Sequence, residues 1–274
     1  MSIYQEFRNL AEDASIEVGR RLLEVQSQRL DVEVSFKSPT DLVTEIDLWA
    51  EKEVTRRIKE AFPGHQILGE ESAPDVSTIT ERETEYSEGF CWTIDPIDGT
   101  TNFVSGIPHA SVSIGISENG KRVVGVVYDP FRDEMFSAVK GKGATLNGTK
   151  IEVSDQRELK KSVVATGYPY SRVKDWPNLK PVYDLFFEQS RDMRTFGSAC
   201  IDQCWVACGR LDGYFEVGIK PWDVAAGSLI VEEAGGKISN PIDAKSEYSS
   251  FAKSFLFAGP ELFNRLSEEF NQLK

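Results

Sequence analysis

Apolar positions recur every three or four residues at the start of the chain and predict an amphipathic helix over residues 3–29. The segment "VEVSFK" then alternates like a strand. Next, "SPTDLVTEIDLWAEKEVTRRIKEAFPG" predicts a loop and then a helix, with Thr44 as N-cap and Pro63-Gly64 as its end. The run "HQILGEES" is short and apolar and ends on two carboxylates, and the polar residues 73–89 predict an exposed loop or hairpin.

The middle of the chain predicts an antiparallel meander. The runs "HASVSIGISEN", "RVVGVVYDP" and "EMFSAVKG" are strand-like, and turn-rich links separate them. From about residue 155 strands alternate with helices, up to a last helix over 260–273. We therefore predict an α/β (α+β) fold, a layered αβαβα sandwich with an antiparallel-meander half and an alternating α/β half. We place its two subdomains at residues 1–154 and 155–274.

Charge and composition narrow the function. The chain of 274 residues carries a net charge of −13, which argues against nucleic-acid binding. No apolar run reaches the ~18 residues that a membrane span needs. The first residues lack the basic and apolar regions of a signal peptide, so we expect a cytoplasmic protein with no membrane partner. If the substrate is an anion, the negative charge of the protein would repel it, and bound divalent cations would be needed to make the site electrostatically positive.

Neither cysteine nor histidine supplies an obvious catalytic centre. Cys200, Cys204 and Cys208 repeat every four residues, which strings the three sulfurs along one helix stripe instead of gathering them around one ion. We interpret this stripe as a buried face of small residues, and we expect no disulfide. The two histidines, His65 and His109, lie in turn-like contexts and fit structural or surface roles.

The stretch "CWTIDPIDGTTNF" carries the candidate chemistry. Asp95 ends a strand-like run, Pro96 should stop that strand, and Asp98-Gly99 makes a turn before a possible helix over "TTNFV". Alone, Asp-Gly is a common turn; with Asp95 it also offers two carboxylates for cations beside backbone N–H groups for an anion. Other carboxylates also end strands or begin helices: Glu70 and Glu71 in "ILGEES", and Asp223 in "KPWDVAAG".

The stretches "GEES", "WTIDPIDGTTNF" and "KPWDVAAGSLIVEEAGG" resemble the three signatures of the inositol monophosphatase family, and the resemblance runs from about residue 5 to the C-terminus. This family belongs to the lithium-sensitive, Mg²⁺-dependent phosphatases, together with fructose-1,6-bisphosphatase. The two residues Pro96-Ile97 between the aspartates separate the motif from the D-x-D-G-T signature of haloacid-dehalogenase phosphatases, in which the first Asp is a nucleophile.

The resemblance implies a role for each matching position. Two to three Mg²⁺ ions would be held by Glu70, Asp95, the carbonyl of Ile97, Asp98 and Asp223. Thr100 and Asp47 would orient and help deprotonate the attacking water, with Glu70 also helping to hold the third ion through water. The phosphate would lie against the N–H groups of Gly99 and Thr100, and the leaving group would meet Gly197, Ser198, Ala199 and Glu216. Lys37 lies in a segment similar to a mobile loop near the metals.

We therefore expect a Mg²⁺-dependent phosphate-monoester hydrolase that forms no covalent intermediate, with inositol 1-phosphate as the first-choice substrate. A small phosphorylated polyol or sugar is the expected partner, and the resemblance also implies lithium sensitivity and a homodimer. Fructose 1,6-bisphosphate, histidinol phosphate and 3′-nucleotide-type phosphates stay open as substrates. A non-catalytic regulatory or scaffolding member is the alternative from another class.

Overall fold

The computed structural model describes residues 2–28, 34–38, 41–73, 78–168, 172–240, 249–252 and 254–272. Seven strands of the described chain form the first sheet, in the order β3-β4-β5-β6-β7-β8-β9. They are β3 Gln66–Gly69, β4 Phe90–Asp98, β5 Ser111–Glu118, β6 Lys121–Asp129, β7 Glu134–Val139, β8 Ala144–Leu146 and β9 Thr149–Lys150. The pair β3–β4 is parallel and the pairs from β4 to β9 are antiparallel, which confirms the predicted meander.

Five strands of the second half form a mixed sheet in the order β11-β10-β12-β14-β13. They are β10 Val163–Thr166, β11 Asp192–Arg194, β12 Gly213–Val217, β13 Lys237–Ser239 and β14 Ser254–Ala258. Strand β10 runs parallel to β11 and β12, whereas β14 is antiparallel to β12 and β13. The predicted boundary at 154/155 falls between the strands of the two sheets, and the division into two subdomains stays a prediction.

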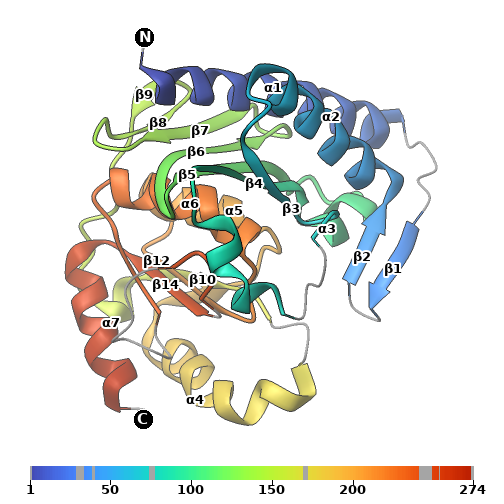
Figure 1. Ribbon diagram of the computed structural model, residues 1–274. Coiled ribbons are helices and arrows are strands. Elements are labelled where there is room, and N and C mark those ends of the chain that lie inside the picture. Colours follow the sequence, from blue (N-terminus) through green and yellow to red (C-terminus); the bar gives the residue numbers. More distant parts are fainter. Residues whose placement is uncertain are drawn as a thin grey trace.

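Helices cover both sheets and produce the predicted αβαβα layers (Figure 1). α1 (Ile3–Gln28) and α2 (Glu45–Ala61) lie on the outer face of the first sheet, and α5 (Ala199–Ala207) and α6 (Pro221–Glu233) lie between the sheets. α4 (Arg172–Gln189) and α7 (Pro260–Gln272) cover the far side of the second sheet. The short α3 (Thr100–Val104) follows β4, and β1 (Val34–Ser38) pairs with β2 (Asp41–Thr44).

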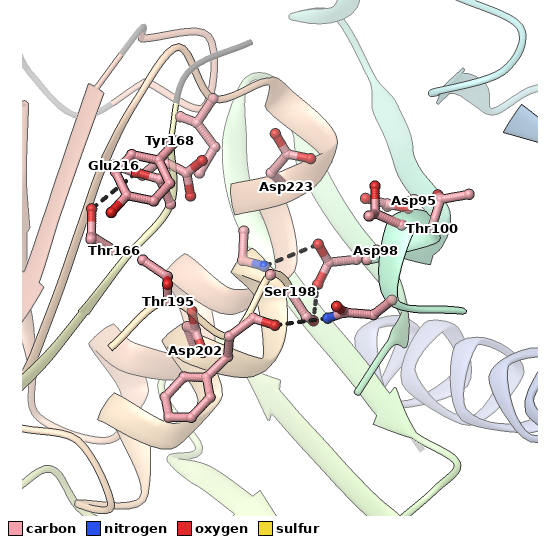
Figure 2. A pocket seen from close by; sticks show the side chains of 18 of the residues that line it. Asp95, Asp98, Thr100, Thr166, Tyr168, Thr195, Ser198, Asp202, Glu216 and Asp223 are labelled. Atoms are coloured by element: carbon pink, nitrogen blue, oxygen red, sulfur yellow. Dashed lines mark hydrogen bonds between the residues drawn. The ribbon is translucent and has the colours of Figure 1, made fainter. Parts of the chain in front are cut away.

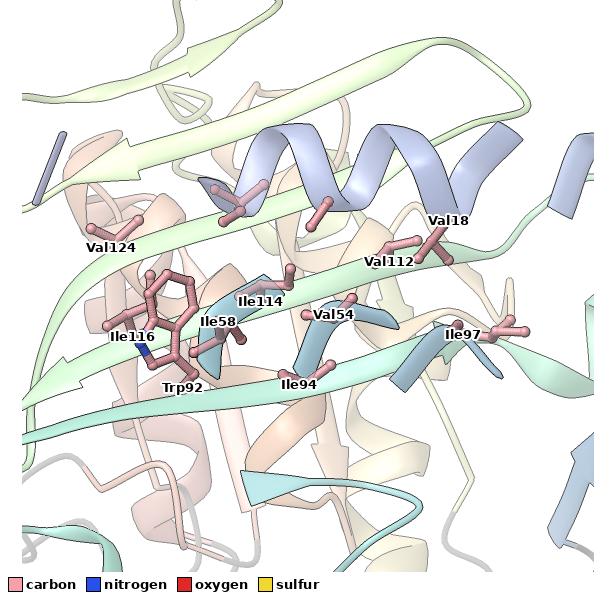
Figure 3. Packing of buried hydrophobic residues seen from close by; sticks show 14 of the residues in the cluster. Val18, Val54, Ile58, Trp92, Ile94, Ile97, Val112, Ile114, Ile116 and Val124 are labelled. Atoms are coloured by element: carbon pink, nitrogen blue, oxygen red, sulfur yellow. The ribbon is translucent and has the colours of Figure 1, made fainter. Parts of the chain in front are cut away.

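The largest hydrophobic cluster fills the space between the first sheet and its outer helices (Figure 3). Val18 of α1, Val54 and Ile58 of α2 and Trp92 of β4 belong to this cluster, and all four are fully buried. Thr44 caps α2 as predicted, because its hydroxyl accepts from the N–H groups of Ile46 and Asp47. This packing fixes β4, and therefore its C-terminal carboxylates, against a rigid layer.

Two glycines allow α6 to lie directly on the other face of this sheet. Gly115 of β5 and Gly125 of β6 are opposite each other in the register. A Cβ at Gly115 would lie 2.6 Å from Ala225 Cβ, and one at Gly125 would lie 2.5 Å from the Ala226 carbonyl oxygen. Because only glycine leaves room for this approach, the start of α6 is brought next to the end of β4.

One local prediction is narrowed and two need correction. For residues 73–89 the loop alternative fits the described part and the hairpin does not: 3₁₀ turns occupy Ile79–Glu81 and Glu83–Tyr86, and residues 74–77 lie outside the described residues. The predicted loop before α2 contains the short strand β2. Strand β4 does not stop at Pro96 but continues to Asp98.

None of the helices in the described ranges is both long and apolar enough to cross a bilayer.

Candidate active site

A β-bulge at the end of β4 places the two central aspartates. Asp95 is opposite Ser113 and Asp98 is opposite Ser111, so β4 uses one residue more than β5 between these two pairs. Because of this bulge, Pro96 does not have to donate a backbone hydrogen bond to β5, and it can therefore lie within the strand. The predicted strand end at Pro96 was wrong for this reason. The turn at Gly99, with φ 95°, and helix α3 follow as predicted.

Every predicted site residue except Asp47 lines one cavity of about 350 Å³ between the two halves (Figure 2). These residues are Glu70, Asp95, Ile97, Asp98, Gly99, Thr100, Gly197, Ser198, Ala199, Glu216 and Asp223. They come from the ends of β3, β4 and β12 and from the starts of α3, α5 and α6. Sequence positions more than 150 residues apart therefore meet in one small volume, as the resemblance implied.

Asp47 lies behind the cavity and reaches it through Thr100. The Thr100 hydroxyl is 3.2 Å from Asp47 Oδ1 and 3.0 Å from the carbonyl oxygen of Ile97. The other Asp47 oxygen accepts from the backbone N–H and the hydroxyl of Thr44, the N-cap of α2. Helix α2 thus orients Asp47, and Asp47 orients the Thr100 hydroxyl at the cavity wall.

Asp98 is held at the N-terminus of α5. Its carboxylate accepts from the N–H groups of Ala199 (3.0 Å) and Cys200 (2.8 Å) and from the hydroxyls of Ser198 and Ser111. Burial raises the pKa of Asp98, and these hydrogen bonds oppose the rise. Ser198 and Ala199 therefore support a carboxylate, in addition to lining the side of the cavity predicted for the leaving group.

Asp223 and Glu216 approach from the second half. Asp223 is the third residue of α6, and its carboxylate accepts from the Lys220 N–H at 2.7 Å. Burial raises the pKa of Asp223 well above its usual range, and the charges of Glu70 and Asp98 raise it further. Burial also raises the pKa of Glu216 to about 7, against the effect of a hydrogen bond from the Tyr214 hydroxyl.

The cavity is strongly acidic. The described residues that line it carry six carboxylates, from Glu70, Asp95, Asp98, Asp202, Glu216 and Asp223, and include no lysine, arginine or histidine. One oxygen of Asp95, one of Asp98 and the sulfur of Cys200 lie within 4.8 Å of one another. Carboxylate and carbonyl oxygens are the ligands that hard divalent cations prefer, so this donor set can hold metal ions.

Sequence reasoning missed several lining residues. Thr166 and Tyr168 lie at the end of β10, where the position of a strand end is the signal that could have found them. Asp202 was not missed: it lies one turn after Ser198 on α5, in the segment that the sequence placed beside the leaving group, and it lines the cavity. The side chain of Lys37 lies outside the part that the structure describes.

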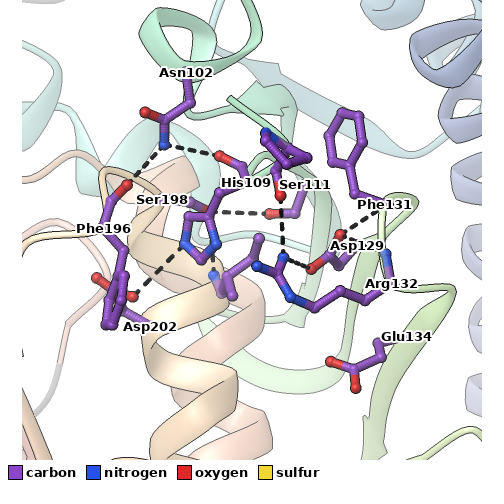
Figure 4. A network of polar contacts seen from close by, with 12 residues as sticks. Asn102, His109, Ser111, Asp129, Phe131, Arg132, Glu134, Phe196, Ser198 and Asp202 are labelled. Carbon is purple, nitrogen blue, oxygen red and sulfur yellow. Dashed lines mark hydrogen bonds and ion pairs between the residues drawn. The ribbon is translucent and has the colours of Figure 1, made fainter. Parts of the chain in front are cut away.

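A buried polar network supports the cavity wall (Figure 4). The amide of Asn102 in α3 donates to the carbonyls of His109 (2.8 Å) and Phe196 (2.7 Å), which ties segments of both halves together. His109 Nε2 lies 3.9 Å from Asp202 Oδ1, and neither atom has a hydrogen bond within the described residues. His109 is therefore buried beside the cavity and not on the surface, and its structural role stays a prediction.

Comparison with known proteins shows which family has this fold and sequence pattern. The model of the inositol monophosphatase family matches residues 3–272. The Nus factor SuhB of Pasteurella multocida is 39% identical over 96% of this chain and 98% of that relative. The inositol monophosphatase of Anabaena (Nostoc) sp. PCC 7120 is 34% identical, with a TM-score of 0.84 over 100% of this chain and 98% of the other. SaIMPase-II with bound inositol monophosphate is 28% identical, with a TM-score of 0.79 over 97% of this chain and 94% of the other. The chain therefore belongs to the inositol monophosphatase family.

Proposed function

We propose that this chain hydrolyses phosphate monoesters with Mg²⁺, and that a phosphorylated polyol such as inositol 1-phosphate is its substrate. The observation that carries the proposal is the cavity with six carboxylates and no basic side chain among its described lining residues. A phosphate ester is an anion and would be repelled from such a cavity in a chain of net charge −13. Divalent cations remove the conflict, because they bind the carboxylates and attract the phosphate.

The donor set fits Mg²⁺. In the proposal, Glu70, Asp95 and the Ile97 carbonyl would hold one ion, and Asp95, Asp98 and Asp223 would hold a second. Glu70 would also help to hold a third. Bound ions of this kind would supply Lewis-acid stabilisation of the phosphoryl oxygens and a more acidic water. The raised pKa values of Asp98 and Asp223 support a cation site, because burial penalises these carboxylates until a positive charge is near.

The chain's own residues would then position the reactants. Thr100, placed between Asp47 Oδ1 and the Ile97 carbonyl, orients the attacking water and passes its proton toward Asp47. The phosphate lies against the N–H groups of Gly99 and Thr100. No nucleophilic side chain is required, so the proposed reaction is a direct attack of water on phosphorus.

Glu216 gives the proposal its substrate class. Its carboxyl group lines the cavity opposite the aspartates. It accepts one hydrogen bond from the Tyr214 hydroxyl, and its remaining lone pairs can accept hydrogen bonds from the hydroxyl groups of a polyol. The bound inositol monophosphate of SaIMPase-II supports this choice. SaIMPase-II has also been solved with 2′AMP, which keeps nucleotide phosphates among the candidates beside fructose 1,6-bisphosphate and histidinol phosphate.

A panel of these four ester classes, with released inorganic phosphate as the readout, tests the proposal. We expect turnover of inositol 1-phosphate with Mg²⁺, loss of turnover in EDTA and recovery when Mg²⁺ is added back. Lithium should inhibit, as the family resemblance implies. No release from any ester with Mg²⁺, or release that EDTA leaves undiminished, would overturn the proposal.

The relatives named Nus factor SuhB favour a second candidate function. A role as a Nus factor is compatible with hydrolysis, because the carboxylates of the cavity and a partner surface need not overlap. Asp95→Asn separates the two: it should abolish hydrolysis and leave a partner role intact. We also propose a cytoplasmic homodimer, for which sedimentation velocity of the purified chain is the test.

A further inference from the structure

Cys200 is a sulfur ligand beside oxygen ligands. It lies in the first turn of α5, whereas Asp95 and Asp98 lie at the end of β4. One donor atom of each lies within 4.8 Å of the other two, and all three side chains are buried. The Cys200 thiol donates weakly to the Asp223 carbonyl, at 3.3 Å.

An unsatisfied hydroxyl lies at the same place. Ser113 is opposite Asp95 in the β4–β5 register and is fully buried, and its Oγ has no hydrogen bond within the described residues. Directly opposite residues of an antiparallel pair project to the same face of the sheet, so the Ser113 hydroxyl lies on the same face as the Asp95 carboxylate. A buried polar atom without a partner is costly, and a bound ion or its water would satisfy it.

The chemistry of the three donors distinguishes two classes of metal. Mg²⁺ takes oxygen ligands and leaves a thiol protonated, so Cys200 is a bystander when Mg²⁺ is bound. Zn²⁺ and Cd²⁺ bind thiolate strongly and also accept carboxylate oxygens. A sulfur within reach of two buried carboxylates therefore offers such ions a ligand that Mg²⁺ cannot use.

We propose that Asp95, Asp98 and Cys200 bind a thiophilic divalent cation such as Zn²⁺ or Cd²⁺, in competition with Mg²⁺ for the two carboxylates. On binding, the S–H bond of Cys200 breaks, its proton leaves to the solvent, and the sulfur binds the cation as thiolate. The competition between this cation and Mg²⁺ rests on the proposed function, whereas the binding of the cation to the three side chains does not.

Cadmium is the sharpest probe, because a Cd²⁺–thiolate bond has an ultraviolet charge-transfer absorption that oxygen ligands lack. Metal-free protein is titrated with Cd²⁺ while this absorption and the bound metal are measured. We expect one equivalent of Cd²⁺ to produce the absorption in the wild-type chain and in Cys204→Ala. Cys204 is the matched control, since it is a fully buried thiol one turn later on the same helix. Cys200→Ala should lose the absorption.

Asp95→Asn is the second variant, because it keeps all four thiols and should still lose tight Cd²⁺ binding. Absence of the absorption in the wild type, or its survival in Cys200→Ala or in Asp95→Asn, would overturn the proposed site. Excess Mg²⁺ should suppress the absorption, and an absorption indifferent to Mg²⁺ would overturn the competition. If no ester is hydrolysed while the absorption still depends on Cys200, the proposed function fails and the metal site stands.

Discussion

Gly125→Ala tests whether the close packing of α6 on the first sheet positions the carboxylates of the cavity. The new Cβ would lie 2.5 Å from the Ala226 carbonyl oxygen and 3.1 Å from its carbonyl carbon. Carbon atoms in good contact are about 3.5–4.0 Å apart, so helix and sheet would have to separate by roughly 1 Å. The obstacle is backbone, which no side-chain rotation can move aside.

The magnitude follows from overpacking. Forcing an extra carbon into a packed interior costs about 1–3 kcal/mol, and the lower flexibility of alanine in the unfolded chain returns about 0.4–1 kcal/mol. The net loss is therefore at most about 2.6 kcal/mol, and at about 2–4 °C per kcal/mol Tm should fall by up to ~10 °C. Asp223 lies one turn before Ala226, and a displacement of about 1 Å at a catalytic group can cost ~100-fold in rate.

Differential scanning calorimetry and Mg²⁺-dependent phosphate release measure the two effects on the same preparation. Gly64→Ala is the matched control, because its Cβ meets no atom within 4 Å and it has no positive φ. The control should stay within about 0.5 kcal/mol of the wild type. A Gly125→Ala protein with unchanged Tm and unchanged turnover would refute the idea that contact between α6 and β6 sets the site geometry.

Three other perturbations act on buried polar groups beside the cavity. Asn102→Ala removes the amide that donates to the carbonyls of His109 and Phe196 and should lower the free energy of unfolding in urea by about 2 kcal/mol. Asn102→Asp replaces this donor by an acceptor and should cost more; equal losses would contradict the donor role. Burial and the charge of Arg132 lower the pKa of His109 from 6.5 to about 4, so the unfolded chain binds the extra proton and stability should fall as pH falls from about 6.5 to 4, by at most ~3 kcal/mol. His109→Gln should flatten that slope in urea titrations at successive pH values, and an unaltered slope would show that the ring is not held neutral. Asp95→Asn should raise the Tm of the metal-free protein by removing one of several crowded negative charges, and a lower Tm would argue against their mutual repulsion.

Local patterns predicted most elements because each segment's preference agrees with its tertiary setting. The apolar spacing of residues 3–29 corresponds to α1, and the alternation after residue 155 corresponds to the second sheet and its helices. Four carboxylates of the cavity were found because they end strands or begin helices within recognisable motifs, namely Glu70, Asp95, Asp98 and Asp223. Glu216 was found only through the resemblance to the family. These carboxylates lie close together because the order of strands and helices brings those strand ends and helix starts to one cavity.

The missed features depend on contacts between distant segments. Pro96 locally argues for a strand end, and only its partner β5 reveals the bulge that accommodates it. In the sequence, Gly115 and Gly125 are only poor strand formers. Their role becomes visible in the fold, where α6 packs directly on them. Cys200 belongs to the predicted buried stripe of α5, and the stripe interpretation holds for Cys204, which is equally buried. Only the fold shows that the first cysteine of the stripe also faces Asp95 and Asp98.

The central claim is that buried carboxylates bind Mg²⁺ for the hydrolysis of a phosphate ester. Its most direct test measures phosphate release from inositol 1-phosphate against Mg²⁺ concentration, for the wild type, Asp95→Asn and Asp192→Asn. Asp192 is an exposed aspartate that pairs with Arg194 outside the cavity, so it controls for the loss of one negative charge. The account predicts saturable Mg²⁺ dependence for the wild type and Asp192→Asn, and a loss of about 10³-fold for folded Asp95→Asn. Turnover of Asp95→Asn equal to that of the wild type at every Mg²⁺ concentration would contradict it.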